Sequence, residues 1–425
     1  MRIMLGLHEI SNVLQNLKKG FDTLGISSDI VLTKDYAFGV DTDLIAKHWS
    51  ISLAKYAILL HRRNKEVFLI RHILAFFSLI GRTILFVRCL TLYDTFIFVA
   101  FSSFFNFKEL IILKFFKKKV IYFILGSDFR PPYLDGSHFQ KNLDEIHRLT
   151  IETKDRVKII EQYASYIISY TAVSHFQTLP YIDYRYFGIP TDYHYIQLKS
   201  IPQPYLKKGK IKIVHAPTNR VAKGTSIITQ TIESLQERYD IEFVLLSNMN
   251  NQEVLYHIAT SDFVIDQLYS GGGYMARFST EAAFFKKPSI VTGYDMSHFY
   301  ENFKYQEKIP PIVYGVPEDL EKLILHLIGD EQYRIEIGEK AYNFVIREWN
   351  PIVIANKFKN LIDDNIPQEW WYNPLQNKTL WYYGRNRLEA RQILREYIAK
   401  FGENALYMEH NQQIKQVILK FAMCP

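Results

Sequence analysis

The chain has 425 residues, of which 48% are hydrophobic, so it is long enough to form more than one buried core. Its formal net charge of +7 favours anionic partners such as phosphates, nucleic acid or an anionic bilayer, without choosing among them. The two cysteines, Cys89 and Cys424, lie far apart and outside any metal-ligand spacing, which excludes a cysteine-based zinc site and favours a reducing compartment. Because residues 1–6 resemble a strand rather than a secretory signal, a cytoplasmic location is predicted.

Strand-like apolar runs alternate with helical patterns, which predicts parallel sheets covered on both faces by crossover helices. The helices predicted in the first half are 12–24 and 107–116. The strands predicted there are 2–6, 29–32, 95–99, 120–124, 167–170 and 184–187.

The most apolar stretch, 70–99, is interrupted by Arg71, Arg82 and Arg88, so a membrane-spanning helix is not predicted. Basic and aromatic runs flank the stretch at 61–65 and 115–119. Two interpretations stay open: a face that lies on a membrane surface, or a core helix and strand with a solvated basic rim.

A segment rich in proline, glycine and lysine at 199–210 is the predicted linker between domains. The predicted domains are 1–198, 211–350 and a helical crossover with a tail at 351–425. The second series of strands is predicted at 211–215, 241–246, 263–266 and 289–291. Its helices are predicted at 225–238, 252–259, 276–287, 320–328, 331–346, 351–362 and, in the tail, 385–400.

Charged and glycine-rich segments directly follow the strands of this second series, where parallel sheets bind ligands. Arg220 and Lys223 follow strand 211–215, and a guanidinium fork with a mobile ammonium suits a diphosphate. The loop of Gly271, Gly272, Gly273 and Tyr274 follows strand 263–266 and can turn backbone amides toward an anion. Glu281, inside the next helix, is predicted to accept hydrogen bonds from ribose hydroxyls. The alternatives are a plain surface loop and a glutamate that only favours the helix start.

The runs 213–225, 261–268 and 279–291 resemble the donor domain of retaining GT-B glycosyltransferases of the family-four type. The resemblance implies an α/β chain of two facing Rossmann-like domains with a cleft between them. It also implies that Arg220 and Lys223 contact the diphosphate of a nucleotide sugar and that Glu281 holds the ribose. Transfer with retention to a glycan or lipid-linked acceptor would then need neither a metal nor another cofactor, and no nucleic acid would be bound.

The first half carries a weaker likeness. Gly126-Ser127-Asp128-Phe129-Arg130 is similar to a cleft-facing loop of some family members, which makes Asp128 a catalytic candidate and Arg130 an acceptor-side candidate. A helix-capping Asp128 with a surface Arg130 is the alternative. His8, after the first strand, lies where the family's acceptor-side loop is found.

One position departs from the family: Gly273 stands where a first glutamate is usual, eight residues before Glu281. The main prediction is a hexosyltransferase of bacterial-type surface polysaccharide or glycoconjugate synthesis, cytoplasmic and peripheral on the inner face of the membrane. The alternatives are a non-catalytic GT-B-like subunit that acts as a membrane-surface partner, and a sugar-nucleotide epimerase. Asp41-Thr42-Asp43 matches a divalent-ion motif, but a turn is the preferred interpretation.

Overall fold

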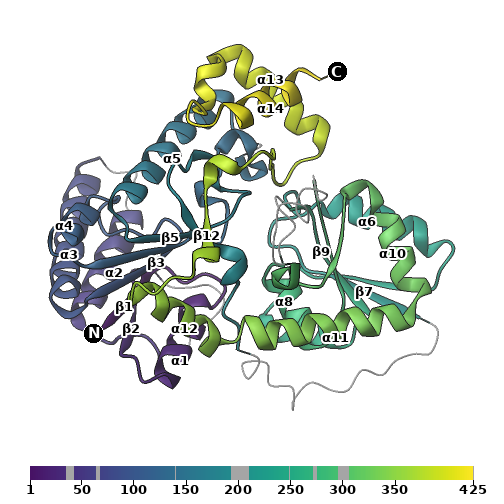
Figure 1. Cartoon of the computed structure of the whole chain (residues 1–425), viewed down its shortest axis with the longest axis horizontal. Coiled ribbons are helices and arrows are strands. Elements are labelled where there is room, and N and C mark those ends of the chain that lie inside the picture. Colours follow the sequence, from purple (N-terminus) through teal and green to yellow (C-terminus); the bar gives the residue numbers. More distant parts are fainter. Residues whose placement is uncertain are drawn as a thin grey trace.

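The computed structural model describes residues 1–34, 43–63, 68–138, 140–192, 210–247, 249–270, 275–294 and 306–424. Within these residues the chain forms two α/β domains, each built on its own sheet (Figure 1). The predicted linker falls almost entirely outside the described residues.

The N-terminal sheet has seven strands in the described part of the chain, in the order β12-β6-β5-β4-β3-β1-β2. All its neighbouring strands run parallel except β12 and β6, which are antiparallel. Its strands are β1 (Ile3–Leu7), β2 (Ser28–Leu32), β3 (Thr95–Val99), β4 (Lys119–Phe123), β5 (Tyr166–Ser169), β6 (Tyr181–Asp183) and β12 (Trp371–Tyr372). Its helices are α1 (Val13–Thr23), α2 (Trp49–Arg63), α3 (Phe68–Leu92), α4 (Glu109–Phe115) and α5 (Leu143–Tyr163).

Apolar runs explain these strands, because a parallel sheet covered on both faces buries both sides of each strand. All five residues of β3 are buried, so the last part of the apolar stretch 70–99 belongs to the core. One strand was predicted wrongly. Residues Tyr184–Tyr186 form a 3-10 turn, and the strand lies just before it at β6, because Asp183 accepts a hydrogen bond from the Arg185 amide and bends the chain.

The C-terminal domain carries a five-stranded parallel sheet in its described part, in the order β11-β10-β9-β7-β8. Its strands are β7 (Ile211–His215), β8 (Ile241–Leu245), β9 (Phe263–Ser270), β10 (Ser289–Gly293) and β11 (Val313–Gly315). Its helices are α6 (Thr225–Gln236), α7 (Asn251–Ala259), α8 (Arg277–Phe284), α10 (Leu320–Gly329) and α11 (Glu331–Glu348). Strand β9 extends four residues past the predicted end at Asp266, so Gln267 to Ser270 belong to the buried sheet.

The chain returns to the N-terminal domain after α11 (Figure 1). Helix α12 (Pro351–Ile362) packs beside α1, and β12 joins the edge of the first sheet. The remaining helices, α13 (Arg387–Phe401) and α14 (Gln412–Met423), lie against the same domain, where Lys400 pairs with Asp144 on α5.

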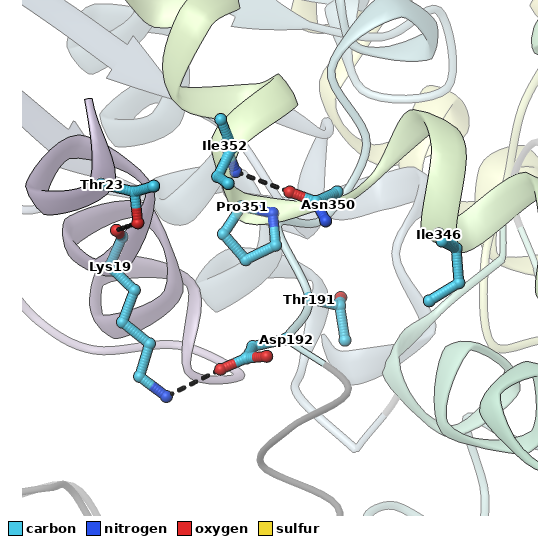
Figure 2. A pocket seen from close by; sticks show the side chains of 8 residues that line it. All are labelled: Lys19, Thr23, Thr191, Asp192, Ile346, Asn350, Pro351 and Ile352. Atoms are coloured by element: carbon cyan, nitrogen blue, oxygen red, sulfur yellow. Dashed lines mark hydrogen bonds and ion pairs between the residues drawn. The ribbon is translucent and has the colours of Figure 1, made fainter.

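A pocket of about 280 Å³ lies where the chain crosses between the domains (Figure 2). Lys19 of α1 pairs there with Asp192 at 3.0 Å, and the Thr191 amide donates to the Trp349 carbonyl at 2.9 Å. The outgoing and returning segments are thus fixed to each other. The tight contact of α1 with α12 supports this junction, because a Cβ on Gly20 would lie 2.1 Å from the Pro351 carbonyl oxygen.

We expect Gly20→Ala to lower the free energy of unfolding by about 1–3 kcal/mol, because the added methyl group forces α1 away from α12. Urea unfolding of the purified protein measures the change. Gly329→Ala is the matched control, because nothing lies within 4 Å of a Cβ at that helix end. An equal effect of the two substitutions would contradict the close packing of α1 on α12.

Candidate active site between the two domains

Two adjoining pockets lie between the domains, at the carboxyl ends of their strands. The Glu281 pocket measures about 320 Å³ and the Lys223 pocket about 440 Å³, each named here for one residue that lines it. Ser11, Ala216, Thr218, Arg277 and Phe278 line both pockets, so the two are parts of one cleft. Such a position is where open parallel sheets bind ligands.

The Lys223 pocket is built from three parts of the chain. The N-terminal domain contributes Gly126, Ser127 and Arg130, and the C-terminal domain contributes the ends of β9 and α8. The tail, whose role the sequence did not predict, adds Tyr383. A small molecule in this pocket would therefore touch both domains and the tail at once.

Lys223 forms a largely buried ion pair in the lining of this pocket. Its ammonium lies 2.7 Å from a carboxylate oxygen of Asp266 and 2.9 Å from the Gln267 side-chain oxygen. Burial opposes the ammonium charge, but the attraction of Asp266 outweighs it and raises the pKa of Lys223. Ser279 donates to the other Asp266 oxygen at 2.7 Å. Without a ligand, the charge of Lys223 is thus balanced by a residue that the sequence analysis did not single out.

Arg220 lies at the outer rim of the cleft. Its exposed guanidinium donates to the Ser247 hydroxyl at 2.8 Å, and Ser247 lines the Glu281 pocket. Arg220 itself is not among the described residues that line either pocket. The long side chain of Arg220 would have to turn inward before its guanidinium could contact an anion in the cleft.

The loop between β7 and α6 that carries both cations is anchored by His215. The ring Nδ1 donates to the Ile265 carbonyl at 2.7 Å, and Nε2 accepts from the Thr225 hydroxyl at 2.9 Å. Burial lowers the pKa of His215 to about 4, so the ring is neutral near pH 7, as the bond that Nε2 accepts requires. His215 therefore fixes the start of α6 rather than exchanging protons with a ligand.

Arg277 is a third cation of the cleft, and the sequence analysis missed it. It stands at the start of α8, lines both pockets and donates to a carboxylate oxygen of Glu281 at 3.0 Å. Its Nη1 is buried and has no hydrogen-bond partner among the described residues. A buried guanidinium nitrogen without a partner costs free energy unless a ligand or water satisfies it. The spacing of Arg277 and Glu281, four residues apart on one helix, was the signal that could have found it.

Glu281 is buried, with 4% of its surface exposed, and it forms part of the pocket wall. Asn251 and Arg277 both donate to its Oε1, at 3.2 and 3.0 Å. No described residue donates to Oε2, so this oxygen keeps its capacity to accept hydrogen bonds. The predicted Gly271–Tyr274 loop lies outside the described residues, but Ser270 and Met275 on either side of it line the Lys223 pocket.

The three candidates of the N-terminal domain lie in different places. Arg130 lines the Lys223 pocket, is 4% exposed, pairs with Asp135 at 3.4 Å and lies 4.7 Å from the centre of the Tyr383 ring. Asp128 and His8 are not among the described residues that line either pocket. Burial raises the pKa of Asp128 to about 6 and lowers the pKa of His8 to about 4.

The glutamate beside His8 has a structural role. Glu9 accepts hydrogen bonds from the amides of Ile10, Leu14 and Gln15, at 2.8 to 3.1 Å, and so caps the start of α1. Ile10 and Ser11, which follow it, line the Lys223 pocket. Of the loop after β1, the residues that reach the cleft are therefore Ile10, Ser11 and Asn12, which lines the Glu281 pocket.

The tail holds Tyr383 in place by bonds to both domains. The Tyr383 amide donates to the Leu134 carbonyl at 3.0 Å, and the Gly384 amide donates to the Tyr269 carbonyl at 3.1 Å. Arg385 is 1% exposed and donates to the Asp135 carbonyl at 2.8 Å. The tail therefore fastens one domain to the other beside the pocket.

The described residues contain no group of three His, Cys, Asp or Glu side chains placed to hold a metal ion. Of the Asp41-Thr42-Asp43 motif, the first two residues lie outside the described part of the chain. Asp43 is exposed and pairs with Lys47 at 3.0 Å.

The chain is similar in structure to sugar-processing proteins at low sequence identity. A trehalose-6-phosphate synthase, a subject of work on glycosyl transfer with retention, matches with a TM-score of 0.52 and 11% identity over 86% of this chain and 99% of its own. The glycosyltransferase of kitacinnamycin has a TM-score of 0.45 and 9% identity over 86% and 98% of the two chains. A Listeria monocytogenes protein described as a UDP-N-acetylglucosamine 2-epimerase has a TM-score of 0.41 and 10% identity, over 86% of this chain and 96% of its own.

No family model and no curated protein matches the sequence. The structural likeness establishes the fold. The chain has the GT-B fold, in which two Rossmann-like domains face each other, and this confirms the predicted fold class.

We expect Lys223→Met to lower the free energy of unfolding by about 3–5 kcal/mol, because it leaves the Asp266 carboxylate buried without its partner. The Asp266 side chain is only 1% exposed, so its carboxylate depends on protein partners rather than on water. Adding Asp266→Asn should recover part of the loss, since it removes the unpaired charge.

Urea unfolding of the single and double variants measures both effects, and Arg220→Met serves as control. Its exposed side chain should change stability by less than about 0.5 kcal/mol. If Lys223→Met were as harmless as Arg220→Met, the Lys223–Asp266 pair would not stabilise the domain.

Proposed function

We propose that this protein is a glycosyltransferase that moves a sugar from a nucleotide-diphosphate sugar to a glycan or lipid-linked acceptor. The observation that carries the proposal is the convergence of Lys223, Arg277 and Glu281 in the walls of one cleft between two Rossmann-like domains. Cations at this place suit a diphosphate, and the accepting oxygen of Glu281 suits ribose hydroxyls.

Different parts of the donor would occupy the two pockets. The nucleoside lies in the Glu281 pocket, whose wall includes Leu246 and Val254 and so offers apolar surface to a base. The diphosphate lies at Arg277, where the pockets meet, and the transferred sugar lies in the Lys223 pocket near Arg130 and Tyr383. Arg220 adds its charge when its side chain turns inward from the rim.

Catalysis then depends on fixed charges that stabilise the departing nucleoside diphosphate in a cleft shielded from water. In the proposed retaining reaction, the acceptor hydroxyl attacks from the side of the leaving phosphate, which takes its proton. The likeness to family-four enzymes supports this stereochemistry and the assignment to bacterial-type surface polysaccharide or glycoconjugate synthesis in the cytoplasm. Asp128 stays a candidate that would need to move to reach the sugar.

An epimerase is the weaker candidate. Such an enzyme needs acid and base groups beside the sugar. Among the described residues that line the Lys223 pocket, the one carboxylate is Asp266, and Lys223 already binds it. A non-catalytic subunit would require that the departure at Gly273 removes turnover, and this residue lies outside the described part of the chain.

We expect Arg277→Gln to weaken binding of the matching nucleotide sugar by about 10- to 100-fold, because a charged hydrogen bond contributes about 1.5–3 kcal/mol. Glutamine keeps an amide that can still donate to Glu281. Calorimetry with uridine, guanosine and cytidine diphosphate sugars first identifies the donor and then measures the variants.

Arg220→Ala should also weaken binding, but by less, because its guanidinium lies at the rim. Arg238→Gln is the matched control, since Arg238 belongs to the same domain and pairs with Glu321 at 2.7 Å on its surface. Equal affinity of the wild type, Arg220→Ala and Arg277→Gln proteins would remove the proposed donor site.

The reaction type is tested by following the sugar by NMR, first with the donor alone and then with acceptor preparations. We expect slow release of nucleoside diphosphate and free sugar without acceptor, and a product with the donor's anomeric configuration when acceptor is present. The Arg277→Gln protein should lose both reactions. Conversion of the bound donor to its epimer would establish the epimerase instead, and binding without any turnover would favour the non-catalytic subunit.

A further inference from the structure

Large apolar side chains gather on the outer surface of α2, α3 and the end of α4. These three segments hold more than half of the exposed large apolar side chains in the described part of the chain. They are Trp49, Leu53, Tyr56 and Leu59 on α2, Ile70, Ile73, Phe76, Phe77, Leu79, Ile80 and Val87 on α3, and Ile111, Ile112, Phe115 and Phe116 on and after α4. We call this set the apolar face. Exposed apolar surface concentrated in this way marks an interaction site.

The first half of helix α3 packs in the opposite sense to an ordinary surface helix. Its small residues Ser78 and Gly81 are buried, and a Cβ on Gly81 would lie 3.2 Å from the Cα of Ala54 on α2. Phe76 and Phe77 point away and are 62% and 56% exposed. A helix of a soluble domain normally turns its large apolar side chains inward, so the outer side of α3 fits an apolar surrounding better than water.

The composition of α3 also allows it to span a membrane: residues Ile70–Leu92 are long and apolar enough, and less than a third of this stretch is buried. The second half of the helix, however, is fixed to the domain. Leu85, Phe86 and Cys89 are buried in the core, and Arg82 donates to the Phe104 carbonyl at 3.1 Å. The helix therefore lies along the domain, with one side open.

The charged side chains of α2 and α3 are all basic. The 15 residues of α2 and the 25 residues of α3 contain no aspartate or glutamate, whereas Lys55, Arg62, Arg71, Arg82 and Arg88 are basic. Lys114, Lys117 and Lys118 add to this charge at and beyond the end of α4. Aromatic side chains such as Trp49 and Tyr56 are common at the level of lipid headgroups. An apolar surface with a basic, aromatic edge complements a bilayer that contains anionic lipids.

We propose that the apolar face is a membrane-binding surface, which lies in the interface of an anionic bilayer with α3 parallel to the membrane plane. A second copy of the chain is a poorer occupant, because a symmetric contact would bring the same basic side chains together. This inference goes beyond the proposed transferase activity and does not require it. A protein that binds membranes at this face could have any activity in its cleft.

The test is flotation of the purified full chain with vesicles of phosphatidylcholine, or of phosphatidylcholine mixed with phosphatidylglycerol. We expect binding to the mixed vesicles, weaker at high salt because the charges are screened. The double substitution Phe76→Ser and Phe77→Ser should lower the partition constant by about tenfold or more, since each ring loses its burial in lipid. Arg88→Gln with Lys118→Gln should lower it by roughly fivefold per charge.

The matched control is Leu179→Ser with Leu388→Ser, which removes two apolar side chains that are 51% and 74% exposed but lie outside the apolar face. It should leave the partition constant within about twofold of the wild type. No binding to either vesicle, or equal loss in the control and the Phe76–Phe77 variant, would overturn the proposal.

Two further outcomes would also overturn it. Membrane-bound protein that resists an alkaline carbonate wash and is released only by detergent would show a spanning helix instead of an interfacial one. A dimer in sedimentation that separates on Phe76→Ser and Phe77→Ser substitution would show that a second copy covers the face. None of these measurements uses a nucleotide sugar, so their failure leaves the transferase proposal untouched.

Discussion

A buried charge pair, Lys223 with Asp266, determines much of the cleft. It joins the loop after β7 to strand β9, and Ser279 ties the same carboxylate to α8. A loop, a strand and a helix of the C-terminal domain thus meet at one polar cluster beside the Lys223 pocket. Because the Asp266 side chain is only 1% exposed, removal of Lys223 would leave a buried carboxylate unpaired, and the cluster holds the loop against β9 and α8.

This pair also sets the electrostatics that a ligand meets. Lys223 is already compensated, Arg220 lies at the rim, and Arg277 has a buried nitrogen without a partner in the described part of the chain. Arg277 is also paired, with Glu281 at 3.0 Å, but it keeps a buried donor without a described partner where the two pockets join. An anion placed there would also lie in the cleft that Lys223 lines.

Much of the fold could be predicted from the sequence, because buried parallel strands and amphipathic helices leave clear periodic patterns. Strands β3 and β7 and helix α12 begin and end at the predicted residues. The periodic patterns gave wrong element boundaries where contacts between distant or side-chain groups determine the backbone conformation. The chain bends after Asp183 because the Asp183 side chain accepts a hydrogen bond from the Arg185 amide. The last four residues of β9 are extended because β10 pairs with this strand as far as Ser270.

The site was harder to predict than the fold. Lys223 and Glu281 could be found because they directly follow strands or stand within a recognisable helix. Arg277 was not predicted, because it lies at the start of a helix beyond the glycine run rather than directly after a strand. Tyr383 had no signal at all, since it lies more than a hundred residues beyond the nearest residue of β9 in sequence and reaches the cleft through bonds of the tail to Leu134 and Tyr269.

The position of β12 has a consequence for synthesis on the ribosome. This strand pairs with the outer edge of β6, yet the whole C-terminal sheet is translated between them. While the second domain is translated, the nascent N-terminal domain therefore has an open sheet edge at β6 and lacks the packing of α12 on α1. Strand β12 closes that edge only after the C-terminal sheet has been translated, so the domain that is begun first is completed last.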